Sequence, residues 1–193
     1  MYSILLSAGW PIWPLLIISI VGLAIVIERA WYLRQIQVIP KSCLESAFSL
    51  ANQLFNGKPV NEQEIQDLKQ SGLAGSLFAC LLKEKIAGST ADTALEELQV
   101  TAQTVWLKLE RYLGALATIA TVAPLLGLFG TVVGMIEIFG SQTPGAGNPA
   151  QLAHGISVAL YNTAFGLVIA IPSLVMWRFF RNKVDRYTVE LEI

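Results

Sequence analysis

Hydroxyl side chains inside apolar stretches are the residues of this chain best placed to do chemistry. Thr131 and Thr163 each stand in a run of apolar and small residues, and we expect them at comparable depths of two antiparallel helices. A hydroxyl can both donate and accept a hydrogen bond, so such a pair could assist a moving proton. A lone threonine in a membrane helix also bonds a carbonyl of its own preceding turn, and this local role stays open for each of them.

Acidic side chains are missing from the centre of every apolar stretch. Glu137 stands near the outer end of the second stretch, where solvent or the following turn can solvate its carboxylate, so its presence needs no proton relay. Glu28 and Arg29 follow directly after the first stretch and mark its end. Proton movement across a membrane generally needs a titratable group midway, which this chain does not supply. The single histidine, His154, excludes a multi-histidine metal site, and no Ser/His, paired-Asp or zinc-ligand constellation occurs. We therefore predict no enzyme, no metal and no cofactor.

The composition is that of a membrane protein. Of 193 residues, 54% are hydrophobic and only 14% are charged, with a mean hydropathy of +0.56. An average soluble domain has about 25% charged residues. Thirteen basic residues against 14 acidic ones give a net charge of -1, so there is no basic excess to hold nucleic acid. Cys43 and Cys80 form no C-x-x-C pair, and we expect reduced thiols.

Three apolar stretches are long enough to cross a membrane, and the segment between the first two is polar and helical. Residues 10–27 carry no charge, and at about 1.5 Å per residue such a run nearly crosses a core of about 30 Å. The uncharged, turn-forming loop before the third stretch predicts an antiparallel hairpin. The predicted organisation is an outward N-terminus with the first span (1–34), a cytoplasmic helical segment (35–110), the second span (111–139), an outer loop (140–151), the third span (152–177) and a cytoplasmic C-terminal helix (178–193).

Apolar spacing predicts that both later helices extend into water. Spacings of three and four relate Leu95, Leu98, Ala102, Val105, Leu109 and Tyr112, and no glycine or proline separates this seam from the second span. We therefore expect one long helix that begins near Ser89 or Thr90. A similar spacing continues the third span through Phe180, Val184, Tyr187 and Leu191.

Basic residues predict the orientation of the spans. Nine lysines and arginines flank the middle segment or follow the third span, whereas the N-terminus and the loop at 140–151 have none. Because lysine and arginine near span ends remain on the cytoplasmic side, the N-terminus faces outward and the C-terminus faces the cytoplasm.

Small residues recur along the second and third spans and allow close approach of helices. They can pack the three helices of one subunit, or they can line the shared interior of an oligomer. The spans also carry hydroxyls and one amide that need shelter from lipid, namely Thr118, Thr121, Thr131, Ser157, Asn162, Thr163 and Ser173, which favours a closed homo-oligomer with a narrow apolar lumen. The predicted pore-lining residues are Pro124, Gly127, Thr131, Ala159, Thr163 and Gly166, with Asn162 and Glu137 as further candidates.

Two segments of these spans carry a family resemblance. The runs APLLGLFGTVVGM at 123–135 and ALYNTAFGLVIAIP at 159–172 are similar to the double signature of the ExbB/TolQ/MotA proton-channel family, especially its ExbB branch. The resemblance covers the second and third spans closely and the remainder by layout. One position departs from it, because many relatives carry glutamate five residues before the third-span threonine, where this chain has Val158.

The resemblance implies a pentamer, all-helical and three-spanning, in the bacterial inner membrane. Its second and third spans would surround two single-span ExbD-like helices that supply an aspartate, which Thr131 and Thr163 would face. Proton flow would then drive motion passed to a TonB-like protein that energises outer-membrane transport. A TolQ-like subunit, an adhesion or gliding motor and a non-conducting membrane scaffold remain alternatives.

Overall fold

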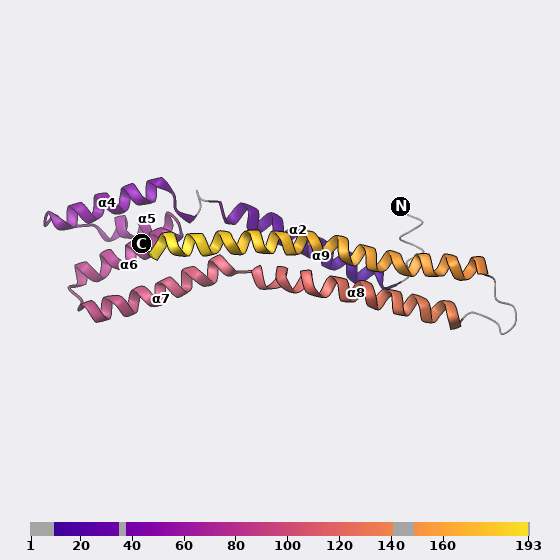
Figure 1. Ribbon diagram of the computed structural model, residues 1–193. Helices are drawn as coiled ribbons and strands as arrows, with labels where there is room; N and C mark the ends of the chain where they lie inside the picture. Colours follow the sequence, from indigo (N-terminus) through magenta and orange to yellow (C-terminus); the bar gives the residue numbers. More distant parts are fainter. Residues whose placement is uncertain (1–9, 35–37, 141–148, 193) are drawn as a thin grey trace. The chain divides into compact units, whose positions relative to one another are not determined.

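The computed structural model describes residues 10–34, 38–140 and 149–192, and within these ranges the regular structure is helical (Figure 1). The helices are α2 (Ile12–Tyr32), α4 (Lys41–Phe55), α5 (Glu62–Gln70), α6 (Leu73–Ala87), α7 (Ala91–Glu110), α8 (Leu113–Gly140) and α9 (Pro149–Glu192).

Three helical segments in the described part of the chain are long and apolar enough to cross a membrane. They lie within Ile12–Tyr32, Ala91–Gly140 and Gly155–Leu191, with mean hydropathies of 2.0, 2.1 and 1.8 over their most apolar windows. The predicted all-helical, three-span fold class is thus confirmed. The third helix also continues well past its apolar part, as predicted, because α9 extends over 44 residues.

The prediction of one uninterrupted helix leading into the second span is wrong. α7 ends at Glu110 and α8 begins at Leu113. Between them Arg111 has an extended backbone, with φ -48° and ψ 134°, and Tyr112 has a φ of 63°. Tyr112 therefore adopts a left-handed conformation, which breaks the helix without the glycine or proline that would have signalled the break.

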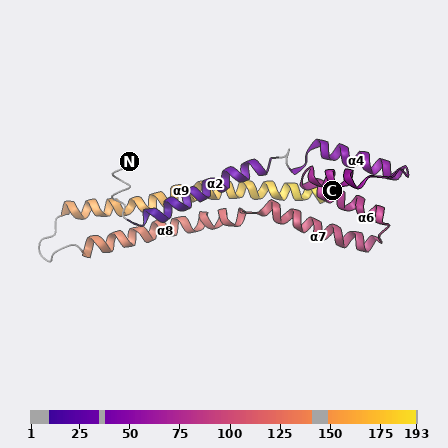
Figure 2. The same ribbon diagram turned by 180° about the vertical axis from the view of Figure 1, so that it is seen from behind.

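The residues form two compact units, Met1–Glu28 with Tyr112–Phe179, and Arg29–Arg111 with Phe180–Ile193. In the first unit α8 and α9 lie side by side and antiparallel, in both the front and the rear view (Figures 1 and 2). α2 packs on this pair at Gly22, where an added Cβ would lie 3.6 Å from Ile119 of α8 and 3.7 Å from the Ser173 hydroxyl of α9.

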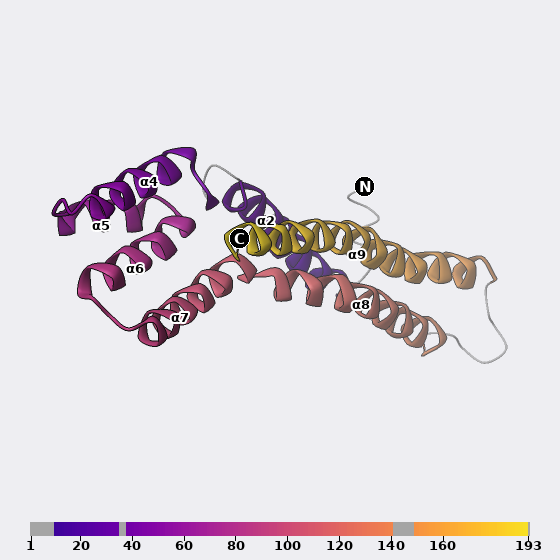
Figure 3. The same cartoon turned by 60° about the vertical axis from the view of Figure 1, so that its left-hand side comes forward.

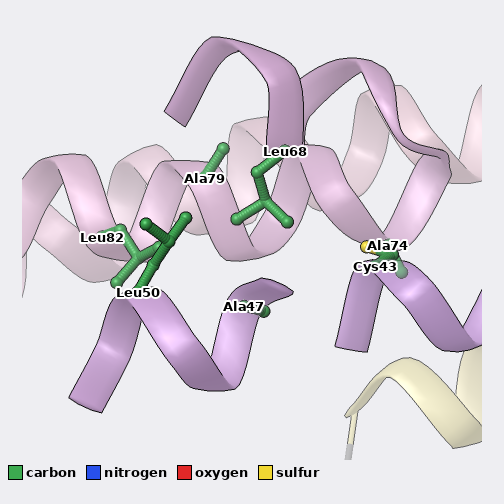
Figure 4. Packing of buried hydrophobic residues seen from close by; sticks show 7 residues of the cluster. All are labelled: Cys43, Ala47, Leu50, Leu68, Ala74, Ala79 and Leu82. Carbon is green, nitrogen blue, oxygen red and sulfur yellow. The ribbon is translucent and has the colours of Figure 1, made fainter. Parts of the chain in front are cut away.

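The second unit has a hydrophobic core of its own. The chain folds back and forth through α4, α5, α6 and α7 (Figure 3), and α6 contacts each of the other three. The buried residues of this core come from α4, α5 and α6 (Figure 4), and they are Cys43, Ala47, Leu50, Leu68, Ala74, Ala79 and Leu82. An apolar cavity of about 610 Å³ lies beside the core, where residues of α6, α7 and the end of α9 line it.

Short polar contacts fix where two helices of this unit, α5 and α7, begin. The Asn61 side chain accepts a hydrogen bond from the Gln63 N–H, and the Glu64 carboxylate accepts one from the Asn61 N–H, which together form a capping box on α5. α7 is capped in a similar way by the Thr90 side chain.

Loss of the α5 cap should loosen that helix selectively. We expect Asn61→Ala to cost about 1 kcal/mol of local stability, because alanine has no side-chain acceptor and leaves an N–H group at the start of α5 unpaired. Hydrogen exchange should then accelerate about fivefold in α5 but not in α9. Asn182→Ala, at an exposed position within α9, is the matched control. Equal exchange rates in α5 of the wild-type and Asn61→Ala proteins would contradict the capping role.

Candidate functional site

Two glycines bring the backbones of α8 and α9 into direct contact. A Cβ added to Gly127 would lie 2.7 Å from the carbonyl oxygen of Asn162 and 3.0 Å from the Cα of Thr163. A Cβ added to Gly166 would lie 2.6 Å from the carbonyl oxygen of Ala123. Because backbone atoms cannot rotate away as side chains do, only glycine fits at either position.

The same contact continues toward the C-terminal end of α8. Gly130 lies against Asn162, whose Cβ would be 2.9 Å from an added Cβ, and Gly134 lies against Ala159 at 3.3 Å. Asn162 and Ala159 are almost fully buried, with exposed fractions of 1% and 2%. We call this the α8–α9 contact, and it consists of Ala123, Gly127, Gly130 and Gly134 of α8 with Ala159, Asn162, Thr163 and Gly166 of α9.

The structure divides the predicted pore-lining residues into two groups. Gly127, Ala159, Asn162 and Gly166 lie inside the α8–α9 contact of a single chain, so packing within the subunit accounts for their small size or burial. The other three, Pro124, Thr131 and Thr163, are half-buried, and of these only Thr163 belongs to the α8–α9 contact, through its Cα. Lining of a pore by either group remains a prediction.

Helix geometry places these three half-buried residues together. Successive residues of an α-helix turn by about 100°, so Pro124 and Thr131 lie on one side of the line of contact residues on α8. In an antiparallel partner the matching side of α9 carries Thr163. Gly127 opposes Thr163 and Gly130 opposes Asn162, so Thr131 and Thr163 differ in depth by only two or three residues, which is roughly 3–5 Å. One edge of the α8–α9 contact thus carries both threonines.

Five hydroxyls of α8 and α9 donate to carbonyls of their own helices. The Thr131 hydroxyl donates to the carbonyl of Leu128 at 2.6 Å, which is the local role left open by the sequence. Four others do the same from either helix, namely Thr118, Thr121, Ser157 and Ser173. A hydroxyl that donates to its helix still keeps a lone pair with which to accept. The Thr131 oxygen can therefore accept a hydrogen bond from a second group while its hydroxyl still donates to the carbonyl of Leu128.

Other candidates lie away from this edge. Glu137 is exposed on α8, three residues before the helix ends at Gly140. The backbones of His154 and Val158 belong to α9, but their side chains lie outside the described part of the structure. Among the residues that are described, no group of three or more His, Cys, Asp or Glu side chains could hold a metal ion.

Sequence reasoning missed two buried positions. Gly22 of α2 gave no signal because an isolated glycine in an apolar run has no partner in the sequence. The sequence places Arg29 beside Glu28 at the end of the first span, yet its side chain is only 1% exposed and it donates from Nη1 to the carbonyls of Lys108 and Leu109. Buried arginines are rare unless they are paired, so burial is the property that the sequence could not provide.

Comparison with known proteins assigns the site to a family. The profile described as the MotA/TolQ/ExbB proton channel family matches residues 62–193, more than half of the chain. The chain belongs to the MotA/TolQ/ExbB proton channel family. The matched residues include both α8 and α9, and therefore the entire α8–α9 contact. The family resemblance of the two sequence runs is confirmed, and so is the prediction that the chain is a membrane transport protein.

Members of the MotA/TolQ/ExbB family that resemble the chain include several transport proteins. An ExbB-like biopolymer transport protein of Synechocystis sp. is 33% identical over 172 residues, covering 88% of this chain and 79% of that protein. The biopolymer transport protein exbB1 of Vibrio cholerae is 30% identical over 195 residues, covering 95% and 80%. The biopolymer transport protein ExbB of Pseudomonas putida is 34% identical over 161 residues, covering 72% and 49%.

Proposed function

We propose that this chain is the pore-forming subunit of an ExbB-like proton channel in the bacterial inner membrane. The observation that carries the proposal is the edge of the α8–α9 contact, where Thr131 and Thr163 lie at similar depth among apolar and small residues. Two hydroxyls on an otherwise apolar surface suit a path that is narrow and sparsely hydrated. Family membership supports the same interpretation.

The proton carrier is a carboxylate of a second protein. No aspartate or glutamate lies in the central part of the three spans, and Glu137 is exposed near the end of α8. A proton relay through a membrane needs a titratable group near the middle. We propose that an ExbD-like single-span partner supplies an aspartate, and that the edge bearing Thr131 and Thr163 faces it.

The subunit works as a closed homo-oligomer, and we propose a pentamer around the partner helices. Homo-oligomers commonly close by rotational symmetry, which turns the same edge of every copy toward one axis. Large apolar residues remain exposed on α8 and α9, including Leu125, Leu128, Val168 and Ile171, and they can face lipid or a neighbouring copy. The N-terminus faces the periplasm, and the C-terminus and the polar helices face the cytoplasm.

Proton flow supplies the work. Moving one charge across the membrane releases about 2.3 kcal/mol per 100 mV. We propose that this energy drives motion of the partner against the oligomer, which a TonB-like protein passes to outer-membrane transporters. The relatives described above are named as biopolymer transport proteins, which favours this role over a TolQ-like or motility role.

Proton uptake by vesicles tests the proposal. The chain is purified with the single-span protein that co-purifies from its own cells, and the mass of the complex gives the number of copies. Vesicles containing the complex should take up protons under a potassium-diffusion potential, whereas vesicles containing the chain alone should not exceed empty vesicles. Replacing the partner's span aspartate with asparagine should abolish the uptake.

Either of two outcomes would overturn a part of the proposal. Strong uptake with the chain alone would contradict the role of a partner carboxylate. No uptake with the intact complex would contradict proton conduction and favour the scaffold alternative.

A further inference from the structure

The α7–α8 junction, which is the stretch from Glu110 to Leu113, is held in an unfavourable backbone conformation. Tyr112 has a φ of 63°, and it is the only non-glycine residue with positive φ among those that the structure describes. The left-handed region is a genuine outlier for a bulky side chain, because its Cβ crowds the following carbonyl. Such a conformation persists only where neighbouring structure holds it.

A buried arginine contacts the end of the helix that precedes this residue. The last four carbonyls of a helix have no partner within it. Arg29, in the last turn of α2, donates from Nη1 to the carbonyls of Lys108 and Leu109, at 3.3 Å each. Its guanidinium carbon also lies 4.8 Å from the centre of the Tyr32 ring, and only 1% of the Arg29 surface is exposed to solvent. A positive charge at a helix C-terminus is additionally favourable because the helix dipole is negative there.

A second set of polar contacts secures the same end of α7. Arg181 of α9 pairs with Glu110, the last residue of α7. Arg181 also contacts Asp185 at 3.3 Å. Tyr187 donates from its hydroxyl to the carbonyl of Leu33, which directly follows α2, at 3.0 Å. The ends of α2 and α7 and the start of the polar part of α9 are therefore joined within one compact unit.

We propose that Arg29 is a positioning residue that holds the α7–α8 junction in its strained, left-handed form. Its guanidinium satisfies carbonyls that a continuing helix would have bonded, so the helix stops where Tyr112 turns. Without the guanidinium, the end of α7 frays and Tyr112 leaves the left-handed region. In terms of the proposed function, on which this part rests, a fixed junction carries movement of the second span into α7, whereas a frayed junction absorbs it.

Hydrogen exchange on the purified full-length protein tests the local claim. Arg29→Leu should accelerate exchange about tenfold or more in the last turn of α7, with no change in α5. Adding Tyr112→Gly should restore protection, because glycine adopts the left-handed conformation without a steric penalty and commonly occupies such positions at helix ends. Adding Tyr112→Ala should not restore it, because alanine lacks the ring but keeps the Cβ.

The single variants keep the proposal testable if Arg29→Leu does not fold. Tyr112→Gly alone should slow exchange at the end of α7, and Tyr112→Ala alone should not. Equal rescue by glycine and alanine would show that the ring, and not backbone strain, matters, and would overturn the proposal. So would acceleration by Arg29→Leu throughout α5 and α6, which would indicate general destabilisation.

Proton uptake gives the functional readout on the same variants. Arg29→Leu should retain proton flux through vesicles but lose energised transport in cells, and Tyr112→Gly should restore the transport. Loss of flux together with transport would contradict the positioning role. If the wild-type complex conducts no protons, the proposed function fails, and the exchange experiment still decides whether Arg29 holds the junction.

Discussion

Replacing Gly127 with alanine should separate α8 from α9 and abolish proton flux. The added methyl group would lie 2.7 Å from one backbone atom of α9 and 3.0 Å from another. Extra atoms in a packed core usually cost about 1–3 kcal/mol even where side chains can move. Here both neighbours are backbone, so we expect a cost at the upper end of that range. Thermal unfolding of the complex in detergent measures the stability, and vesicle uptake measures the flux.

Gly114→Ala is the matched control for this substitution. Gly114 lies on the same helix, and a Cβ there would meet nothing within 4 Å. Alanine at an open helical position is neutral or slightly stabilising relative to glycine. We therefore expect Gly114→Ala to retain stability and flux. Similar losses from both substitutions would show that general helix perturbation, and not the α8–α9 contact, explains the effect.

The double substitution Thr131→Val/Thr163→Val should lower proton flux while leaving assembly intact. Valine has nearly the shape of threonine, so packing at the edge of the α8–α9 contact is preserved while both hydroxyls are removed. Loss of a hydrogen bond to a charged or proton-carrying group costs about 1–3 kcal/mol. An increase of that size in the barrier lowers the rate by about 5- to 150-fold. Proton uptake by vesicles containing the chain and its partner measures the change.

The control removes two hydroxyls of α8 that lie away from that edge. Thr118 and Thr121 are exposed and, like Thr131, donate to carbonyls of their preceding turns. Thr118→Val/Thr121→Val therefore loses the same kind of local bond, and its flux should match the wild-type value. Full flux from the Thr131→Val/Thr163→Val protein would rule out a role for the hydroxyls in the proton path.

The sequence predicts those parts of the fold that depend on apolar length and period. The three spans and the extension of α9 follow directly from such patterns, because long apolar helices need only lipid to be stable. The break at Tyr112 does not follow, since a tyrosine in a left-handed conformation contradicts its local preference. Arg29 is separated from its contacts Lys108 and Leu109 by 79 and 80 positions in the sequence. No local pattern encodes such a long-range contact.

The candidate site was predictable in composition but not in arrangement. The small residues of the second and third spans left two interpretations open, packing within one subunit and lining of a shared interior. The distances around Gly127 and Gly166 show that packing within one chain uses these glycines. Which side of each helix Thr131 and Thr163 occupy depends on the register of α8 against α9. That register is set by the opposing glycines and cannot be obtained from either helix alone.

The α8–α9 contact also limits how the hairpin can move. Where two helices meet through side chains, one can slide along the other as rotamers exchange. At Gly127 and Gly166 the meeting surfaces are main-chain atoms, so a shift of even a fraction of a helical turn would drive carbonyl oxygens into Cα atoms. We therefore expect α8 and α9 to translate and tilt together as one rigid body. Any proton-driven movement would then take place between the outer faces of this helix pair and a neighbouring copy, lipid or a partner helix.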